Sequence, residues 1–191
     1  GHTRAATRAA AMLYSGSGTT RNFILAKQYY LMAASKGDSE AENALGIMIE
    51  VPGAALAADA LARDSDFFAI GSNDLTMYTL ATDRANEHVA HLFDPLHPAV
   101  LRLIQFATSA ALRARIPISI CGEMAGEPRY AALLIGLGLR ELSMSPASIP
   151  RVKQRIREMD ALAAATRANL IMDQTDSGRI ATLLDDFNAL A

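Results

Sequence analysis

The chain of 191 residues is poor in several features that would point to particular protein classes. It has a single cysteine, so it cannot form an internal disulfide, and a reducing cytoplasm is its expected location. It has no tryptophan and only 6% aromatic residues, which argues against base-stacking surfaces. Its formal net charge of −2 gives no reason to expect a nucleic-acid partner. No apolar run is long enough to span a bilayer, so membrane insertion is not expected.

Apolar residues are abundant, at 51% of the chain, and many of them form short runs that stop at polar clusters. Each cluster is followed by an alanine- and leucine-rich stretch with helical character. A strand followed by a helix, repeated along the chain, predicts a parallel sheet whose strand carboxyl ends carry the chemistry. The three runs and their clusters are Ile47–Ile49 before Glu50, Phe67–Ile70 before Gly71–Asp74, and Ile116–Ile120 before Cys121–Met124.

The same spacing predicts the remaining elements from residue 46 onward, with prolines in the first turn of several helices. The sequence predicts helices over residues 52–63, 75–80, 98–115, 128–137, 150–172 and 177–190, and a fourth strand over residues 141–144. Four β/α units are half of what a closed (β/α)₈ barrel needs. The expected fold is therefore α/β: a partial (β/α)₈ TIM barrel over residues 46–191, preceded by an α-helical hairpin over residues 1–45.

The hairpin region has a different pattern. Helical segments are expected over residues 9–13, over residues 23–35 and from Ser39 to Leu45, where Glu42 could complete a capping box with Ser39. Residues 9–46 resemble a single Sel1-like repeat. One repeat buries little surface, so it would have to dock elsewhere, associate with another chain or be a remnant. The resemblance is carried by Leu13-Tyr14, Gly16-x-Gly18, Ala26, Tyr29-Tyr30, Ala33-Ala34, Gly37, Ala41 and Ala44-Leu45-Gly46.

Glu50 and Asp74 are expected at neighbouring strand ends, because one β/α unit separates them. Two carboxylates there would form the hard oxygen site that Mg²⁺ prefers, together with phosphate oxygens and water. The alternative is that Glu50 is a solvated rim residue and that Asp74 caps the following turn. Spacing alone leaves both interpretations open.

Three further rim residues also have two interpretations. Asn73 offers an amide donor, or it is a left-handed turn residue. Arg84, on the loop that would arch over the rim, could hold a phosphate with its planar fork, or it is a solvated charge. Cys121 could act as a general acid, or it is a small buried apolar residue.

Several segments together resemble the phosphoenolpyruvate-utilising enzymes, and most closely the phosphoenolpyruvate-protein phosphotransferase (enzyme I) family of the bacterial sugar phosphotransferase system. Pyruvate phosphate dikinase and phosphoenolpyruvate synthase share the rim residues, whereas the last two segments are closer to enzyme I. The resemblance covers about residues 46–191. The segments are Gly46–Pro52, Asp66–Leu80, Asp83-Arg84, Leu92–Val100, Cys121–Gly126, Leu142–Pro146 and Ile149–Lys153.

The resemblance implies a role for each rim residue. Glu50 and Asp74 would bind Mg²⁺, which bridges the phosphate and the carboxylate of phosphoenolpyruvate. Asn73, Asp74 and Arg84 would bind the substrate, and Cys121 would protonate the enolate carbon as pyruvate forms. The resemblance also implies phosphoryl transfer to a histidine, a phosphocarrier protein as partner, and a homodimer.

Parts of the family pattern are missing from this sequence. The acceptor histidine of the family lies in a Gly-Gly-x-Thr-Ser-His setting, which does not occur here, and the front half of the barrel is also absent. His88, His91 and His97 belong to a loop and lack the paired spacing of zinc ligands, so they are interpreted as loop residues that contact turns. The chain is therefore predicted to be an enzyme I fragment that is not active alone. The alternatives are a Sel1-type protein-binding scaffold with an inert barrel remnant, or a dikinase or synthase fragment.

Overall fold

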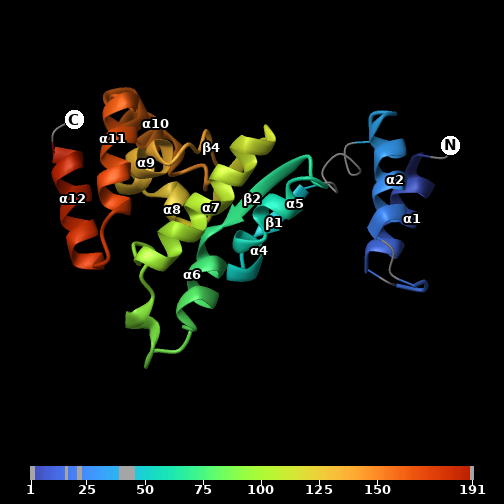
Figure 1. Ribbon diagram of the computed structural model, residues 1–191, viewed down its shortest axis with the longest axis horizontal. Helices are drawn as coiled ribbons and strands as arrows, with labels where there is room; N and C mark the ends of the chain where they lie inside the picture. The colour runs from blue at the N-terminus through green and yellow to red at the C-terminus, as the bar shows by residue number, and fades with distance from the viewer. Residues whose placement is uncertain (1–2, 16, 21–22, 39–45, 190–191) are drawn as a thin grey trace. The chain divides into compact units, whose positions relative to one another are not determined.

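The computed structural model describes residues 3–15, 17–20, 23–38 and 46–189 (Figure 1). The chain divides into two compact units, Gly1–Gly46 and Ile47–Ala191. The helix expected from Ser39 to Leu45, with its capping box, lies outside the described residues. In the described part of the chain, none of the helices combines the length and the hydropathy that crossing a bilayer requires.

The first unit contains two helices packed against each other, α1 (Thr3–Ser15) and α2 (Phe23–Ala34). Helix α1 is longer than the predicted segment over residues 9–13. Gly37, at φ 77°, ends the second helix. Its N–H and that of the next residue bond back to α2 carbonyls in a Schellman arrangement, as the predicted break requires. The buried residues that the two helices share are Ala6, Ala10, Tyr30 and Ala33.

The second unit is built on a four-stranded sheet with the order β1-β2-β3-β4. Strand β2 pairs with β3, and β3 with β4, in parallel. Neighbouring strands follow one another in chain order, so the winding continues in one direction as in a (β/α)₈ barrel, whereas a doubly wound sheet reverses its order. The predicted fold class, a partial barrel, is confirmed. The strands are β1 (Gly46–Ile49), β2 (Phe67–Gly71), β3 (Ile118–Cys121) and β4 (Glu141–Leu142).

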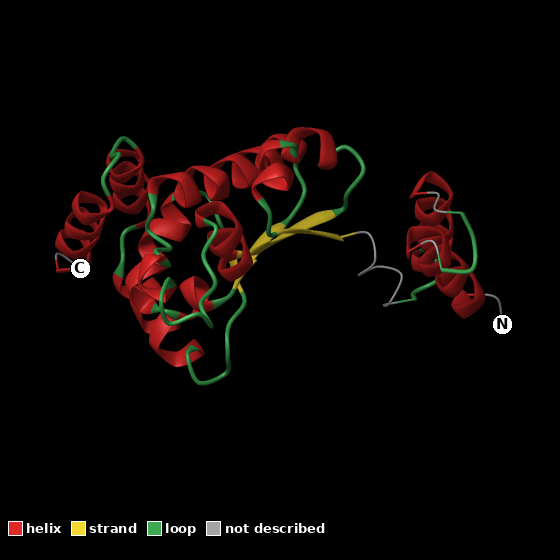
Figure 2. Ribbon diagram, turned by 90° about the horizontal axis from the view of Figure 1, so that it is seen from below, coloured by secondary structure: helices red, strands yellow, loops and turns green. Residues whose placement is uncertain are grey.

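Helices connect and cover these strands, as Figure 2 shows in red around the yellow sheet. The long helix α7 contacts β2, β3, α4 and α5. The sheet side chains that are buried in the core are Ile49, Phe68, Ile70, Ile118 and Ile120. In chain order the helices of this unit are α4 (Pro52–Leu56), α5 (Ala58–Leu61), α6 (Ser72–Leu80), a 3₁₀ turn (Ala90–Leu92), α7 (Pro98–Ala114), α8 (Glu123–Gly126), α9 (Pro128–Gly136), α10 (Ile149–Glu158), α11 (Ala161–Met172) and α12 (Ser177–Ala189).

Two long predicted helices are each divided in the structure. The predicted helix over residues 52–63 is interrupted at Ala57, where the N–H of Ala60 bonds back over only three residues. The predicted helix over residues 150–172 is divided at Met159 and Asp160. The Asp160 carboxylate accepts hydrogen bonds from two backbone N–H groups and so starts α11 as a new helix.

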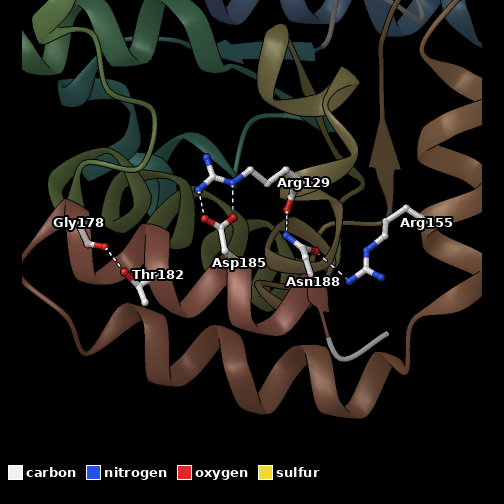
Figure 3. Close-up of polar contacts among 6 residues, drawn as sticks. All are labelled: Arg129, Arg155, Gly178, Thr182, Asp185 and Asn188. Carbon is white, nitrogen blue, oxygen red and sulfur yellow. Dashed lines mark hydrogen bonds and ion pairs between the residues drawn. The ribbon is translucent and has the colours of Figure 1, made fainter.

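The last helix, α12, is attached to the rest of the second unit, called the barrel unit below, by polar contacts (Figure 3). The Arg129 guanidinium donates from Nε and Nη2 to the two carboxylate oxygens of Asp185, at 2.7 and 2.9 Å. Asn188 donates its amide to the Arg129 carbonyl at 3.0 Å and accepts from Arg155 at 2.9 Å. Because Arg129 lies on α9 and Arg155 on α10, these bonds attach α12 to both helices.

Candidate functional site

The carboxyl ends of the first three strands form one edge, and Glu50 lies at this edge directly after β1. In the register of β2 and β3, Gly71 pairs with Cys121, so these two strands end at the same level. A Cβ atom added to Gly71 would lie 3.0 Å from the Glu50 Oε2 atom. The Glu50 carboxylate therefore lies against the end of β2, and glycine at position 71 leaves the room for it.

Asn73 and Asp74 lie in the first turn of α6, which begins directly at the end of β2. The two structural alternatives for these residues are wrong. Asn73 is helical rather than left-handed, and the residue in the N-cap position is Gly71 rather than Asp74. The helix starts early because the buried Ser72 hydroxyl donates to the Cys121 carbonyl at 2.7 Å and holds the turn against β3. A carboxylate in a first helical turn is favourably placed relative to the helix dipole.

Gly122 brings the β3 end close to the β2 end. Its φ is 98°, and an added Cβ would lie 2.5 Å from the Ser72 Oγ atom. The next residue, Glu123, donates its backbone N–H to Asn73 Oδ1 at 3.3 Å. The loops after the two strands are thus joined by direct bonds between residues about fifty positions apart.

Cys121 is partly buried at the end of β3. The pKa of its thiol is raised above the ordinary value, first by burial and then by the negative charges of Glu50 and Asp74. Glu50 and Asp74, predicted at the ends of β1 and β2, thus act on the thiol at the end of β3. A thiol with a raised pKa stays protonated at neutral pH, so it is suited to donating a proton rather than to attacking as a thiolate.

Arg84, on the loop after α6, donates from Nη1 to the Glu123 Oε1 atom at 2.6 Å. Its guanidinium lies 5.3 Å from the centroid of the Phe93 ring. The loop therefore reaches the same edge of the sheet, as expected. Sequence reasoning missed Glu123 and Phe93 as its partners, although both lie in the segments that carried the family resemblance.

Comparison with known proteins identifies the family. Residues 19–161 match the family described as PEP-utilising enzyme, PEP-binding domain. The chain belongs to this family. The match begins inside residues 9–46, for which the Sel1-like interpretation stays a prediction.

Curated relatives of this PEP-binding domain are phosphoenolpyruvate-protein phosphotransferases. The protein of Cupriavidus necator is 56% identical over 112 residues, which are 59% of this chain and 19% of the relative. That of Haemophilus influenzae is 43% identical over 143 residues, 75% of this chain and 25% of the relative. That of Buchnera aphidicola subsp. Baizongia pistaciae is 40% identical over 168 residues, 88% of this chain and 29% of the relative. The chain thus spans less than a third of each of these relatives.

The two carboxylates of this PEP-binding domain fit a divalent cation that takes further ligands from elsewhere. Among the described residues, neither Glu50 nor Asp74 forms an ion pair with a basic side chain. The described part of the chain contains no group of three or more His, Cys, Asp or Glu residues that could hold a metal ion without further ligands. A cation bound here would have these two carboxylates as ligands. It would complete its coordination shell with substrate oxygens and water, as Mg²⁺ commonly does in proteins.

A cleft of about 730 Å³ adjoins this edge on the side of β4. It borders the carboxylates and the thiol only through Asn73, Gly122 and Glu123, because Glu50, Asp74 and Cys121 do not line it. The reacting centre suggested by the strand ends is therefore beside this cleft. The remaining lining residues are Phe93, Pro95, Met124, Gly126, Glu127, Tyr130, Ser143, Met144, Ser145, Ser148 and Arg151.

His88, His91 and His97 lie in the segment between α6 and α7, with His91 in its 3₁₀ turn. His97 takes the N-cap position of α7, where its Nδ1 accepts the N–H of Ala99 at 3.2 Å. This is a turn contact of the kind expected for these residues.

Proposed function

We propose that this chain is the phosphoenolpyruvate-binding part of a phosphoenolpyruvate-protein phosphotransferase. It binds phosphoenolpyruvate with Mg²⁺ and supports transfer of the phosphoryl group to a histidine, with release of pyruvate. The observation that carries the proposal is that Glu50, Asp74 and Cys121 lie at one edge of the sheet, where Gly71 pairs with Cys121 and the Glu50 carboxylate lies against Gly71. The names of the curated relatives support the same substrate.

Glu50 and Asp74 are the proposed ligands of Mg²⁺. When bound, the ion would neutralise charge on the transferring phosphoryl group, and phosphoryl transfer depends mainly on such neutralisation and on positioning. Neither carboxylate pairs with a basic side chain in the described part of the chain, so both are available to a cation.

Asn73 and Arg84 are the proposed contacts of the phosphoryl oxygens. The Asn73 side-chain oxygen already accepts the Glu123 N–H, which leaves its NH₂ group to donate. The first turn of α6 adds backbone N–H groups and the positive end of the helix dipole.

Cys121 is the proposed proton donor. When the phosphoryl group leaves phosphoenolpyruvate, the enolate carbon takes a proton to become the methyl group of pyruvate. In this step the S–H bond of Cys121 breaks, a C–H bond forms, and the thiolate regains its proton from water. Burial, the largest of the causes that raise the pKa of this thiol, favours its protonated form.

The phosphoryl acceptor is proposed to be a histidine of another domain or chain, because no described histidine lies among the edge residues. A phosphocarrier protein as the onward partner, a homodimer and a cytoplasmic location belong to the same proposal. A single cysteine supports the last of these.

Titration calorimetry with phosphoenolpyruvate, with and without Mg²⁺, tests the proposal on the wild-type chain and on Asp74→Ala. We expect Mg²⁺-dependent binding in the wild type and a loss of about 10–100-fold or more in the variant. Asp186→Ala, which removes an exposed carboxylate on α12, is the matched control and should bind like the wild type. Failure of the wild type to bind would reject the proposal and favour the protein-binding scaffold.

A further inference from the structure

Glu123 contacts both of the other loops at the edge of the sheet. Its backbone N–H donates to Asn73 Oδ1, and its carboxylate accepts from Arg84 at 2.6 Å. The Phe93 ring lies against the same guanidinium. Arg84 thus contacts both a carboxylate on α8 and an aromatic ring on its own loop.

The Arg84–Glu123 contact differs in geometry from two other arginine–carboxylate pairs in the chain. Arg113 and Arg129 each donate from Nε and Nη2 and engage both oxygens of an aspartate. Arg84 donates to Glu123 from Nη1 alone, and this is its one hydrogen bond among the described residues. Most of the guanidinium N–H groups of Arg84 therefore remain available for a second anion.

We propose that Glu123 is a positioning residue that holds the Arg84 guanidinium toward the phosphoryl group of phosphoenolpyruvate. This inference rests on the proposed function. The Glu123 side chain is 73% exposed, so the pair adds little to folding stability. Its contribution is to restrict a long side chain before the substrate binds, so that less freedom is lost on binding.

The opposite role for Glu123 would be that of a competitor, which occupies the arginine and must be displaced by the phosphoryl group. Two substitutions separate these roles. Glu123→Ala removes both the acceptor and the charge, whereas Glu123→Gln keeps an acceptor oxygen on a side chain of the same length. If Glu123 is a positioning residue, glutamine should preserve phosphoenolpyruvate binding and alanine should weaken it. A competitor improves binding when either substitution removes it.

The test measures calorimetric binding of two Mg²⁺-dependent ligands to the full chain. Phosphoenolpyruvate carries the phosphoryl group, whereas oxalate resembles the enolate of pyruvate and lacks it. We expect Glu123→Ala to weaken phosphoenolpyruvate binding by about three- to tenfold and to leave oxalate binding unchanged. Glu123→Gln should bind phosphoenolpyruvate within about twofold of the wild type, whereas clearly tighter binding by this variant would favour the competitor role. Glu127→Ala, a neighbouring carboxylate that pairs with Arg151 instead, is the matched control and should bind both ligands normally.

A double-mutant cycle with Arg84→Ala checks that Glu123 acts through Arg84. The double variant should bind phosphoenolpyruvate no more weakly than Arg84→Ala alone, because residues that act through one contact are not additive. Unchanged or tighter binding by Glu123→Ala, or an equal loss for oxalate, would overturn the positioning role while the proposed function stands. If the wild type binds neither ligand, the proposed function fails first and this role fails with it.

Discussion

Replacement of Gly122 by alanine should destabilise the barrel unit strongly, because this residue has two independent reasons to be glycine. Its backbone, at φ 98° and ψ −170°, lies in a region that is essentially restricted to glycine, and other residues there cost about 1–3 kcal/mol. A Cβ atom would also lie 2.5 Å from the Ser72 hydroxyl, which is buried and bonds to the Cys121 carbonyl. Displacing that hydroxyl leaves buried polar groups without partners, at about 1–3 kcal/mol.

The two contributions together predict a loss of about 2–6 kcal/mol, against a total stability of about 5–15 kcal/mol for typical domains. Urea unfolding followed by circular dichroism measures the loss as a lower midpoint at an unchanged slope. Gly53→Ala is the matched control, because nothing lies within 4 Å of its added Cβ in α4. It should be neutral or stabilising by up to about 1 kcal/mol.

A second variant shows whether the Ser72 hydroxyl is the obstacle. Ser72→Ala combined with Gly122→Ala removes the clashing oxygen, so the loss in the double variant should be smaller than the sum of the two single losses. If the free energy of unfolding of Gly122→Ala lies within about 1 kcal/mol of the wild-type value, the reasoning about both the backbone and the contact is refuted.

Two further predictions concern the thiol and the last helix. Because the pKa of Cys121 is raised, its alkylation by iodoacetamide should reach half of its maximal rate at a higher pH than that of a free cysteine. Glu50→Gln removes one of the charges that raise this pKa and should move the midpoint to lower pH. Asn188→Ala removes the bonds of α12 to the Arg129 carbonyl and to Arg155, and should lower the free energy of unfolding in urea by about 1–3 kcal/mol.

Each of these has a control. Glu127→Gln, outside the groups that act on the thiol, should leave the alkylation profile unchanged. A profile that Glu50→Gln also leaves unchanged would show that the Glu50 carboxylate does not act on Cys121. Thr182→Ala removes only an exposed hydroxyl that bonds within its own helix, and should have the same free energy of unfolding as the wild type. An equal loss in Asn188→Ala and Thr182→Ala would contradict the bridging role.

Local sequence signals predicted the elements whose ends depend on their own residues. Helix α7 begins at Pro98 and ends before Arg115, within one residue of the prediction, because a proline and a long apolar period fix it. The division between α10 and α11 was missed, because it consists of only two residues in extended conformation, Met159 and the capping Asp160. The early start of α6 was also missed, because it depends on a bond from Ser72 to a residue 49 positions away.

The sequence by itself determined which side chains follow each strand, because alternating strands and helices place the polar clusters at strand ends. Tertiary structure alone decided how those side chains meet. The Glu50 carboxylate lies against Gly71, burial and two negative charges raise the Cys121 pKa, and Glu123 joins Asn73 to Arg84. These contacts follow from the order and register of parallel strands, and no local spacing encodes the register between segments about fifty residues apart.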